Sequence, residues 1–459
     1  MKLAPYPEYK DSGQPFLGKI PAHWELFRNG RLFSQRNETG FGELPILEVS
    51  LKTGVRVRDM DNLKRKQVMS DREKYKRAVQ GDIAYNMMRM WQGAVGVAPV
   101  DGLVSPAYVV VRPFPEVDCR YFSYLFRTAS YMNEVDAYSR GIVKDRNRLY
   151  WQDFKSMPSP VPSFDEQQQI TRFLDVIGAK TQRFIRNKRR LIELLKEQKQ
   201  NVISQAVTRG LDPKVKLKPS GIEWVGDIPK HWEYRYFFQS FREKQVKNGG
   251  LIEVNRLSLS YGKIIRKSID ATDGLLPLSF ETYQIVEQGD IILRLTDLQN
   301  DHKSLRVGRV EERGIITSAY LCIYTLPKII SEFAYLLLHT YDLRKIFYGM
   351  GGGVRQSIGF TELKRWPFPV PPASEQGEIV GFIKEETKAI DDTITRAERE
   401  IELMREYRTR LISSVVTGQV DVRGIKVPEI SEDELLTVDE DTSESDDMIN
   451  DELEAGLEE

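Results

Sequence analysis

Two long stretches of the chain carry apolar residues at the alternating three- and four-residue spacing of a heptad repeat. The positions in the first stretch are Thr181, Ile185, Lys188, Ile192, Leu195, Lys199, Val202 and Ala206. Each has a counterpart 209 residues further on, and these are Ile390, Ile394, Ala397, Ile401, Met404, Arg408, Leu411 and Val415. Both stretches run for about 44 residues without proline. The pattern predicts two long helices, each roughly 65 Å long at 1.5 Å per residue, with N-caps at Asp165 and Ser374.

A seam of this length must be buried against another helix, and each stretch is the obvious partner of the other. Because the chain between them has to leave and return, we expect an antiparallel coiled coil. Thr181, Lys188 and Lys199 interrupt the first seam, which favours either a register set by specific pairing or a seam covered in part by another protein. The alternative is that each helix folds back on its own domain.

Sequence motifs also recur with an offset of 208 or 209 residues. Gly18–Glu25 (GKIPAHWE) matches Gly226–Glu233 (GDIPKHWE), Gln80–Ile83 (QGDI) matches Gln288–Ile291, and Pro158–Pro162 matches Pro367–Pro371. Glu-Gln pairs, Glu166-Gln167 and Glu375-Gln376, follow the Pro-rich segments. The chain is therefore a tandem duplication, and 459 residues are enough for two domains with connectors.

The motifs themselves have mostly structural interpretations. His23, Trp24, His231 and Trp232 are expected to form a structural element at the start of each copy. The Glu-Gln pairs are expected to support helix capping, and contact with a partner protein is the alternative.

The residues before each helix alternate short apolar runs with Gly, Asp and Pro, and they include helix-like segments around 122–132 and 333–347. This texture predicts an α+β fold, so the organisation is two globular α+β domains, each followed by a long α-helix. The predicted boundaries are 1–162 for the first domain, 163–212 for the central helix, 213–371 for the second domain, 372–421 for the distal helix and 422–459 for an acidic tail.

Charge is distributed unevenly along the chain. The total is neutral, with 67 Lys and Arg against 67 Asp and Glu, but residues 429–459 hold 15 acidic residues and no Lys or Arg. Residues 1–428 therefore carry 67 − 52 = +15. Such a basic body favours a polyanionic partner such as nucleic acid, although a basic excess also occurs in proteins that do not bind DNA. The tail is expected to be disordered, and a solubilising role is favoured over competition with DNA.

Several classes of protein are disfavoured. No stretch approaches 18 uncharged apolar residues and the start lacks a signal-peptide pattern, so we expect a cytoplasmic protein. Cys119 and Cys322 are far apart in the sequence, and the four histidines lack metal-ligand spacing, so no metal site is expected.

Motifs for catalysis are also missing. The sequence has no [DN]-PP-[YFW] element for amino-methyl transfer, and the Gly-rich 349–357 lacks the GK[ST] of a nucleotide loop. Glu386 and Lys388 have no positioned aspartate near them, which makes a nuclease site unexpected. We therefore expect a non-catalytic chain without a cofactor of its own.

The order of these motifs resembles the specificity subunit of type I restriction-modification enzymes over about residues 6–421. The resemblance rests on the SG and G-x-IP-x-HWE motifs that open each copy and on the P-x-PVP-x(3)-EQ motif that opens each helix. Inside the copies, 81–93 with 102–108, and 293–301 with 314–320, are similar to segments of that family's target-recognition domains. The acidic tail departs from the family pattern.

The resemblance implies a DNA-binding subunit that reads a two-part target, one half for each domain, while the paired helices fix the unread spacer. It also implies two methyltransferase subunits and restriction (translocase and nuclease) subunits as partners. S-adenosylmethionine, ATP and Mg²⁺ would be bound by those partners. The assembled complex would then be a type I site-specific deoxyribonuclease and DNA (adenine) methyltransferase.

Candidate DNA-contacting residues combine Lys and Arg, which suit phosphates, with Arg and Gln, which suit base edges. Basic loop-like stretches, Gly-rich segments and the Met- and Trp-rich 87–92 supply them, although any one surface cation is more often simply solvated. The candidates are Arg56, Arg58, Lys64, Arg65, Lys66, Arg89, Gln92, Lys144, Arg146, Arg266, Lys267, Arg294, Lys303, Arg306, Arg355 and Gln356. Arg146, Arg355 and Gln356 are the preferred base readers.

Two rival interpretations remain open. One is the recognition subunit of a type IIB-like or other methylation-based defence system. The other is a scaffold whose duplicated modules bind proteins rather than DNA.

Overall fold

The computed structural model describes residues 3–51, 53–58, 72–141, 147–221, 225–268, 279–296, 298, 304–349 and 358–428. It contains two compact units. Unit 1 comprises Met1–Lys188 with Glu398–Glu459, and unit 2 comprises Arg189–Ala397. Each unit therefore holds one globular domain together with the adjoining parts of both long helices.

Unit 1 is built on a four-stranded antiparallel sheet in the order β4-β11-β8-β9. Its strands are β4 Phe33–Arg36, β11 Tyr108–Pro113, β8 Ile83–Asn86 and β9 Val95–Val97. Two-stranded antiparallel pairs surround it, and these are β1 Tyr9–Asp11 with β2 Lys19–Pro21, β3 Glu25–Arg28 with β12 Pro158–Val161, β5 Leu47–Ser50 with β6 Gly54–Val57, and β7 Lys76–Ala78 with β10 Gly102–Val104.

Unit 2 repeats this topology strand for strand, with a sheet in the order β16-β23-β20-β21. The sheet consists of β16 Phe241–Lys244, β23 Leu321–Thr325, β20 Ile291–Leu293 and β21 Val307–Arg309. Its pairs are β13 Leu217–Pro219 with β14 Asp227–Pro229, β15 Glu233–Tyr236 with β24 Pro367–Val370, β17 Leu257–Ser260 with β18 Lys263–Arg266, and β19 Gln284–Val286 with β22 Gly314–Ile316. The duplication inferred from sequence is thus a duplication of fold.

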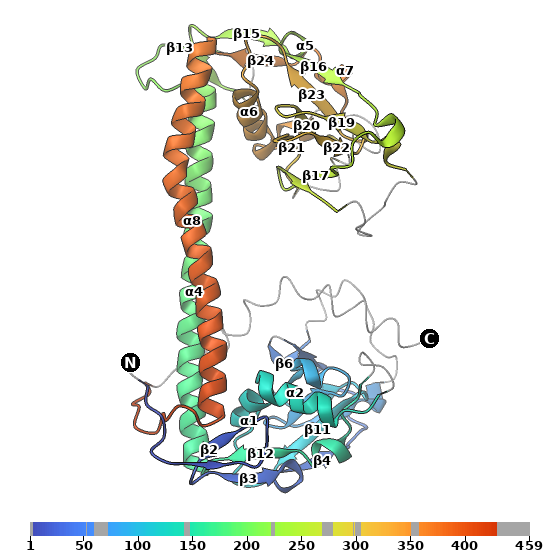
Figure 1. Ribbon diagram of the computed structural model, residues 1–459, viewed down its shortest axis with the longest axis vertical. Coiled ribbons are helices and arrows are strands. Elements are labelled where there is room, and N and C mark those ends of the chain that lie inside the picture. The colour runs from blue at the N-terminus through green and yellow to red at the C-terminus, as the bar shows by residue number, and fades with distance from the viewer. Residues whose placement is uncertain are drawn as a thin grey trace. The chain divides into compact units, whose positions relative to one another are not determined.

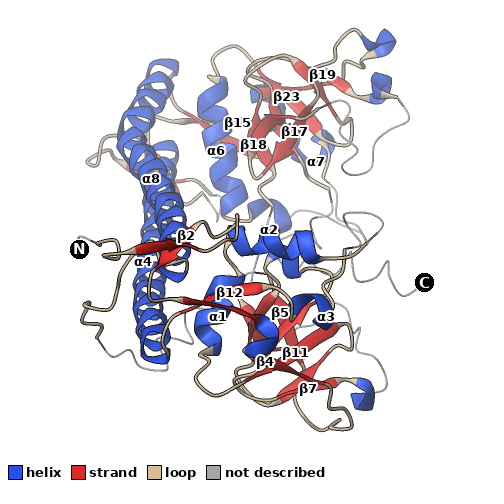
Figure 2. Ribbon diagram, turned by 60° about the horizontal axis from the view of Figure 1, so that its bottom comes forward, coloured by secondary structure: helices blue, strands red, loops and turns tan. Residues whose placement is uncertain are grey.

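Short helices complete each unit, and Figure 2 shows α1, α2 and α3 beside the strands of unit 1. They are α1 Cys119–Phe126, α2 Ala129–Tyr138 and α3 Trp151–Phe154 in unit 1, and α5 Phe237–Ser240, α6 Ser331–Leu343 and α7 Phe360–Leu363 in unit 2. Aromatic side chains from α1, α2 and α3 fill the core under the unit 1 sheet, among them Phe122, Phe126 and Phe154, all fully buried.

The long helices are α4 Phe164–Arg209 and α8 Ala373–Val416, which lie side by side and antiparallel (Figure 1). The expected coiled coil is confirmed, since seam positions such as Ile185, Ile192, Ile394 and Ala397 are buried. Helices of 46 and 44 residues are roughly 65–70 Å long.

Both lysines in the α4 seam pair with acids on α8. Lys188 Nζ lies 2.6 Å from Glu400 Oε2 within unit 1, and Lys199 Nζ lies 2.6 Å from both carboxylate oxygens of Asp391 within unit 2. Of the two explanations for the interrupted seam, these contacts support specific pairing.

The expected N-caps need correction. Helix α4 begins at Phe164, and the hydroxyl of Ser163 accepts the Glu166 amide at 3.4 Å, so Ser163 stands at the cap and Asp165 lies inside the first turn. Helix α8 begins at Ala373, which places Ser374 inside its first turn. Both helices therefore start two residues earlier than Asp165 and Ser374 indicated.

The chain that follows α8 completes the core of unit 1. Val422 is fully buried there, Asp421 forms an isolated antiparallel bridge with Ala4, and Gln169 Nε2 donates to the carbonyls of Val422 and Ile425 at 3.1 and 2.8 Å. The segment after the distal helix therefore belongs to the first domain. Within the described residues, no helix has the length and apolar character needed to span a membrane.

Candidate nucleic-acid interface

The same geometry joins the two recurring motifs in both units. In unit 1, Glu166 Oε1 accepts the Trp24 indole Nε1–H at 3.0 Å, and Glu166 Oε2 lies 2.9 Å from His23 Nε2. The Tyr6 hydroxyl also donates to Glu166 at 2.7 Å. The HW motif of the domain is thereby fastened to the first turn of its helix.

Unit 2 repeats this junction. Glu375 Oε1 accepts the Trp232 indole Nε1–H at 3.0 Å, and Glu375 Oε2 lies 2.7 Å from His231 Nε2. Lys214 stands where unit 1 has Tyr6, so the third donor is missing. The expectation of a structural role for the HW motifs agrees with this geometry.

The glutamine of each Glu-Gln pair joins three segments of its own domain. The Gln167 side chain accepts the Asp118 amide at 2.9 Å and donates to the Pro162 carbonyl at 3.0 Å. Gln376 accepts the Ile330 amide at 2.8 Å and donates to the Pro371 carbonyl at 2.9 Å. Both glutamine side chains are buried. They make long-range contacts within their own domain, in addition to any contribution to helix capping.

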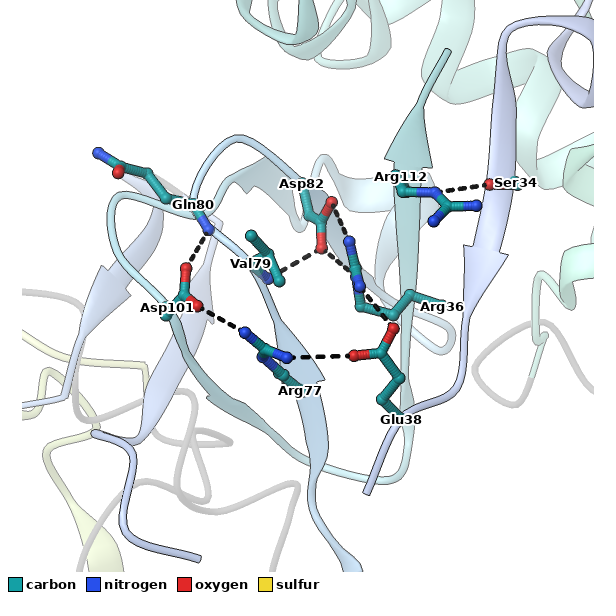
Figure 3. A network of polar contacts seen from close by, with 9 residues as sticks. All are labelled: Ser34, Arg36, Glu38, Arg77, Val79, Gln80, Asp82, Asp101 and Arg112. Atoms are coloured by element: carbon teal, nitrogen blue, oxygen red, sulfur yellow. Dashed lines mark hydrogen bonds and ion pairs between the residues drawn. The ribbon is translucent and has the colours of Figure 1, made fainter. Parts of the chain in front are cut away.

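A network of ion pairs links Arg36 on β4 and Arg77 on β7 to three carboxylates of unit 1 (Figure 3). The Arg36 guanidinium contacts Asp82 and Glu38, each at 2.6 Å, and Arg77 contacts Glu38 at 3.4 Å and Asp101 at 2.9 Å. Burial raises the pKa of Asp82, and the hydrogen bond from Arg36 opposes that shift. The Asp of the QGDI motif is thus a structural anchor.

The same anchor recurs in unit 2, where Lys244 Nζ lies 2.6 Å from Asp290 Oδ2. Nearby in unit 1, Lys76 donates to the Tyr108 carbonyl at 2.7 Å and burial lowers its pKa. Lys76 and Arg77 therefore serve contacts inside unit 1.

Two candidate DNA-contacting residues occupy equivalent positions in the two units. The Arg58 amide donates to the Ile46 carbonyl at 2.8 Å after strand β6, and the Lys267 amide donates to the Arg256 carbonyl at 2.9 Å after strand β18. Lys267 is exposed, whereas the Arg58 side chain is 20% exposed and lies 3.9 Å from Glu48.

The neighbouring arginines of these hairpins also have acidic partners. Arg56 on β6 pairs with Glu48 across the hairpin, and Arg266 on β18 pairs with Glu312 through a bidentate contact. A phosphate contact by either arginine would share or replace its carboxylate.

Glycines bring these hairpins close to the sheets. A Cβ at Gly96 on β9 would meet the Val55 amide nitrogen at 2.5 Å, and one at Gly308 on β21 would meet Leu259 at 2.6 Å. The β5–β6 hairpin of unit 1 therefore packs beside β9, and the β17–β18 hairpin of unit 2 packs beside β21. The connections that lead into these two strands are β8–β9 and β20–β21. We define this part of each unit, the hairpin end with the connection, as the candidate interface.

Arg89 and Gln92 lie on the β8–β9 connection. A 3-10 turn at Met90–Gln92 ends at Gly93 with φ 91°, and the Trp91 indole donates to the Met88 carbonyl at 2.9 Å. Gln92 is exposed and Arg89 is partly buried, so the segment has a folded backbone with Gln92 presented to solvent.

Arg306 requires a correction. Its side chain is fully buried, and its guanidinium donates to the Arg294 carbonyl at 3.1 Å, the Thr296 carbonyl at 2.7 Å and the Tyr348 hydroxyl at 3.0 Å. A side chain with this burial is not placed to contact DNA. Arg294 itself is partly buried at the start of the same connection.

The remaining candidates lie outside the described residues. They are Lys64, Arg65, Lys66, Lys144, Arg146, Lys303, Arg355 and Gln356. In the part of the chain that the structure describes, no group of three or more His, Cys, Asp or Glu side chains is arranged to hold a metal ion.

Sequence reasoning missed the roles of Glu166, Glu375, Gln167 and Gln376 in joining each domain to its helix. The signal was available, because the HW and Glu-Gln motifs recur together in both copies. Two α+β units with one topology, joined by an antiparallel helix pair, define a class of duplicated two-domain proteins.

Comparisons with known proteins show what this chain is similar to. Residues 280–403 match the model described as "Type I restriction modification DNA specificity domain". A putative type I restriction enzyme MjaX specificity subunit from Methanocaldococcus jannaschii is 22% identical over 89% of this chain and 96% of its own length. The type I restriction enzyme MjaVIII specificity subunit of the same organism is 24% identical over 59% of this chain and 64% of its own length.

A solved structure supports the same fold. A chain from a study of complex assembly and conformational transition of the type I R-M system has a TM-score of 0.60 at 13% identity, covering 86% of this chain and 98% of that chain. The chain is thus similar in sequence and in fold to type I restriction-modification specificity subunits.

Proposed function

We propose that this chain is the sequence-specific DNA-binding subunit of a type I restriction-modification complex and that it reads a bipartite target, one half for each unit. The observation that carries the proposal is the strand-for-strand repetition of one fold, with the candidate interface at equivalent positions of both copies. A net charge of +15 over residues 1–428 supplies attraction to phosphates.

The helix pair would set the unread spacer between the half-targets. The buried seam makes the helix pair stiff, and the Lys188–Glu400 and Lys199–Asp391 ion pairs fix its register. The number of residues in the helices would therefore set the length of the spacer. We also propose that two methyltransferase subunits and restriction subunits dock on this chain.

Catalysis would then belong to those partners, with S-adenosylmethionine, ATP and Mg²⁺ bound there and this chain non-catalytic. Its own residues would select the site and hold it in register. Cytoplasmic assembly follows from such a role, because the substrate is chromosomal or invading DNA.

The experiment that tests the function is sequencing of modified bases in the host genome with and without this gene, in a host that expresses the associated methyltransferase. The expected result is a methylated two-part motif with a fixed gap that disappears on deletion and returns on complementation. Exchange of residues 1–160 with those of a relative should change one half only.

Deletion that leaves every modified motif intact contradicts the proposal. Binding to protein partners that is insensitive to salt and to added DNA would then favour a protein-binding scaffold. A two-part motif without cleavage by a separate translocase would favour a type IIB-like system.

A further inference from the structure

The β20–β21 connection of unit 2 differs from its counterpart in unit 1 at one buried position. The amides of Asn86 and Arg294 donate to the carbonyls of Ala94 and Arg306 at 3.0 and 2.8 Å, which identifies Ala94 and Arg306 as equivalent. Seven residues separate the pair in unit 1 and eleven separate it in unit 2. The longer connection is thus accompanied by the replacement of a small apolar side chain with an arginine.

Arg306 fastens the start of this connection to its end. Its Nη1 donates to the carbonyls of Arg294 and Thr296, at 3.1 and 2.7 Å, while its own backbone stands directly before β21. Leu295 and Leu298 between these points are both buried. A lysine, with a single charged nitrogen, could not reproduce the planar set of donors.

The same guanidinium also reaches a second segment. Its Nε donates to the Tyr348 hydroxyl at 3.0 Å and its Cζ lies 5.1 Å from the centre of the Tyr348 ring, in the 3-10 turn η7 Ile346–Gly349. The Ile358 amide donates to the Leu295 carbonyl at 2.8 Å. Residues 294–296, 306, 348 and 358 therefore meet around one buried cation.

A buried guanidinium is costly unless its donors are satisfied and a counter-charge is near. Asp342 Oδ2 on α6 accepts the backbone amide of Arg306, and attraction to the Arg306 charge opposes the rise in pKa that burial imposes on the Asp342 carboxyl. Unit 1 forms the same sheet with alanine at this position, so the sheet itself does not require the arginine. The arginine instead fixes the two ends of the β20–β21 connection relative to each other and to η7.

We propose that Arg306 is a positioning residue for DNA recognition by unit 2, acting by holding the ends of the β20–β21 connection and η7 in the geometry that reads one half of the target. This inference rests on the proposed function. The candidate reader Arg294 begins this connection, whereas the Arg306 side chain is fully buried and acts only through the segments that it holds.

The test is selection of bound sequences from randomised duplex DNA by the full chain, with the Arg306→Met variant, which keeps much of the side-chain volume and removes the donors. The expected result is an unchanged first half-motif and a loss of about tenfold or more in preference at the second. Ile228→Val, a cavity-forming change on β14 that lies outside the hairpin and the connection of the candidate interface, is the control and should leave both halves unchanged.

Tyr348→Phe keeps the proposal testable if Arg306→Met does not fold. It removes only the acceptor hydroxyl and should weaken the second half-motif in the same way but less. A folded Arg306→Met, or failing that Tyr348→Phe, with both half-motifs unchanged overturns the inference, and so does an equal loss at both halves. If the unaltered chain selects no motif, the proposed function fails instead.

Discussion

Trp24 and Glu166 are 142 residues apart in the sequence, and the Trp24 indole donates to Glu166 Oε1 at 3.0 Å. Trp232 and Glu375 make the same bond at the same distance in unit 2. The bond ties the link between β2 and β3 in unit 1, and between β14 and β15 in unit 2, to the first turn of a long helix. This carboxylate therefore helps to fix the orientation of each domain on its helix.

Removal of this carboxylate should loosen the first domain more than the second. Glu166→Ala leaves the indole of Trp24 and the hydroxyl of Tyr6 without their acceptor in a buried site, at a cost of about 1–3 kcal/mol for each unsatisfied group. Hydrogen exchange of residues 20–28 in the full chain, measured by mass spectrometry, should accelerate.

Glu375→Ala is the matched comparison. Its site is more exposed and lacks a tyrosine donor, so exchange around residues 228–236 should rise less. Equal effects of the two changes, or no effect of Glu166→Ala, would contradict the role assigned to this bond.

The Lys199–Asp391 ion pair should help to set the register of α4 against α8 and should add little to the free energy of unfolding. Because both side chains are partly exposed, the pair is expected to contribute about 0.2–1 kcal/mol. Lys199→Glu should lower the denaturation midpoint, and the double variant Lys199→Glu with Asp391→Lys should recover most of the loss. A double-mutant cycle in chemical denaturation measures the coupling, and additive losses would show that the two side chains do not interact.

Acidification should destabilise unit 2 through His339. This side chain lies on α6 with its ring 5.5 Å from Tyr335, and burial lowers its pKa from the usual 6.5. The folded unit holds the neutral imidazole while the unfolded chain gains a proton, so stability is complete above pH 6.5 and is lost as pH falls towards the lower folded-state pKa.

Chemical denaturation at pH 7.5 and pH 5 measures this loss. His339→Gln cannot titrate, so the drop between the two pH values should be smaller than in the unaltered chain. An identical drop in both proteins would assign the acid sensitivity to other groups.

Lys267 is expected to contact the DNA backbone rather than base edges. Lys267→Ala should weaken binding to all sequences alike and reduce the slope of log affinity against log salt by about one. Fluorescence anisotropy titrations at several salt concentrations measure both effects. Lys230→Ala, which removes an exposed lysine near the helix junction, should change neither, and a sequence-dependent loss with Lys267→Ala would instead indicate base readout.

The sequence predicted the parts of the structure that depend on repetition and periodicity. Heptad spacing located α4 and α8, and the shared offset of the motifs indicated two copies of one fold. The helix starts were wrong because Asp165 and Ser374 have cap chemistry, whereas the chain becomes helical directly after Pro162-Ser163 and Pro372.

Long-range contacts were harder to predict. Glu166 was assigned to capping because its partners are far away in sequence, and Arg306 was assigned to DNA because a single arginine gives no sign of burial. Only the tertiary structure shows that carbonyl groups, a tyrosine and Asp342 surround it. The equivalence of Arg58 and Lys267 likewise became visible only from matching backbone hydrogen bonds.

The most direct test of the account is a chain that carries the second reader twice, with residues 10–160 replaced by 218–369. The junction residues Trp232 and Glu166 preserve the bond that fastens each reader to its helix. Selection from randomised duplex DNA by this chain should return a bipartite motif whose two halves are copies of the original second half. A motif that retains the original first half, or selection of a single half alone by a folded chain, would contradict the claim that each unit reads one half of the target.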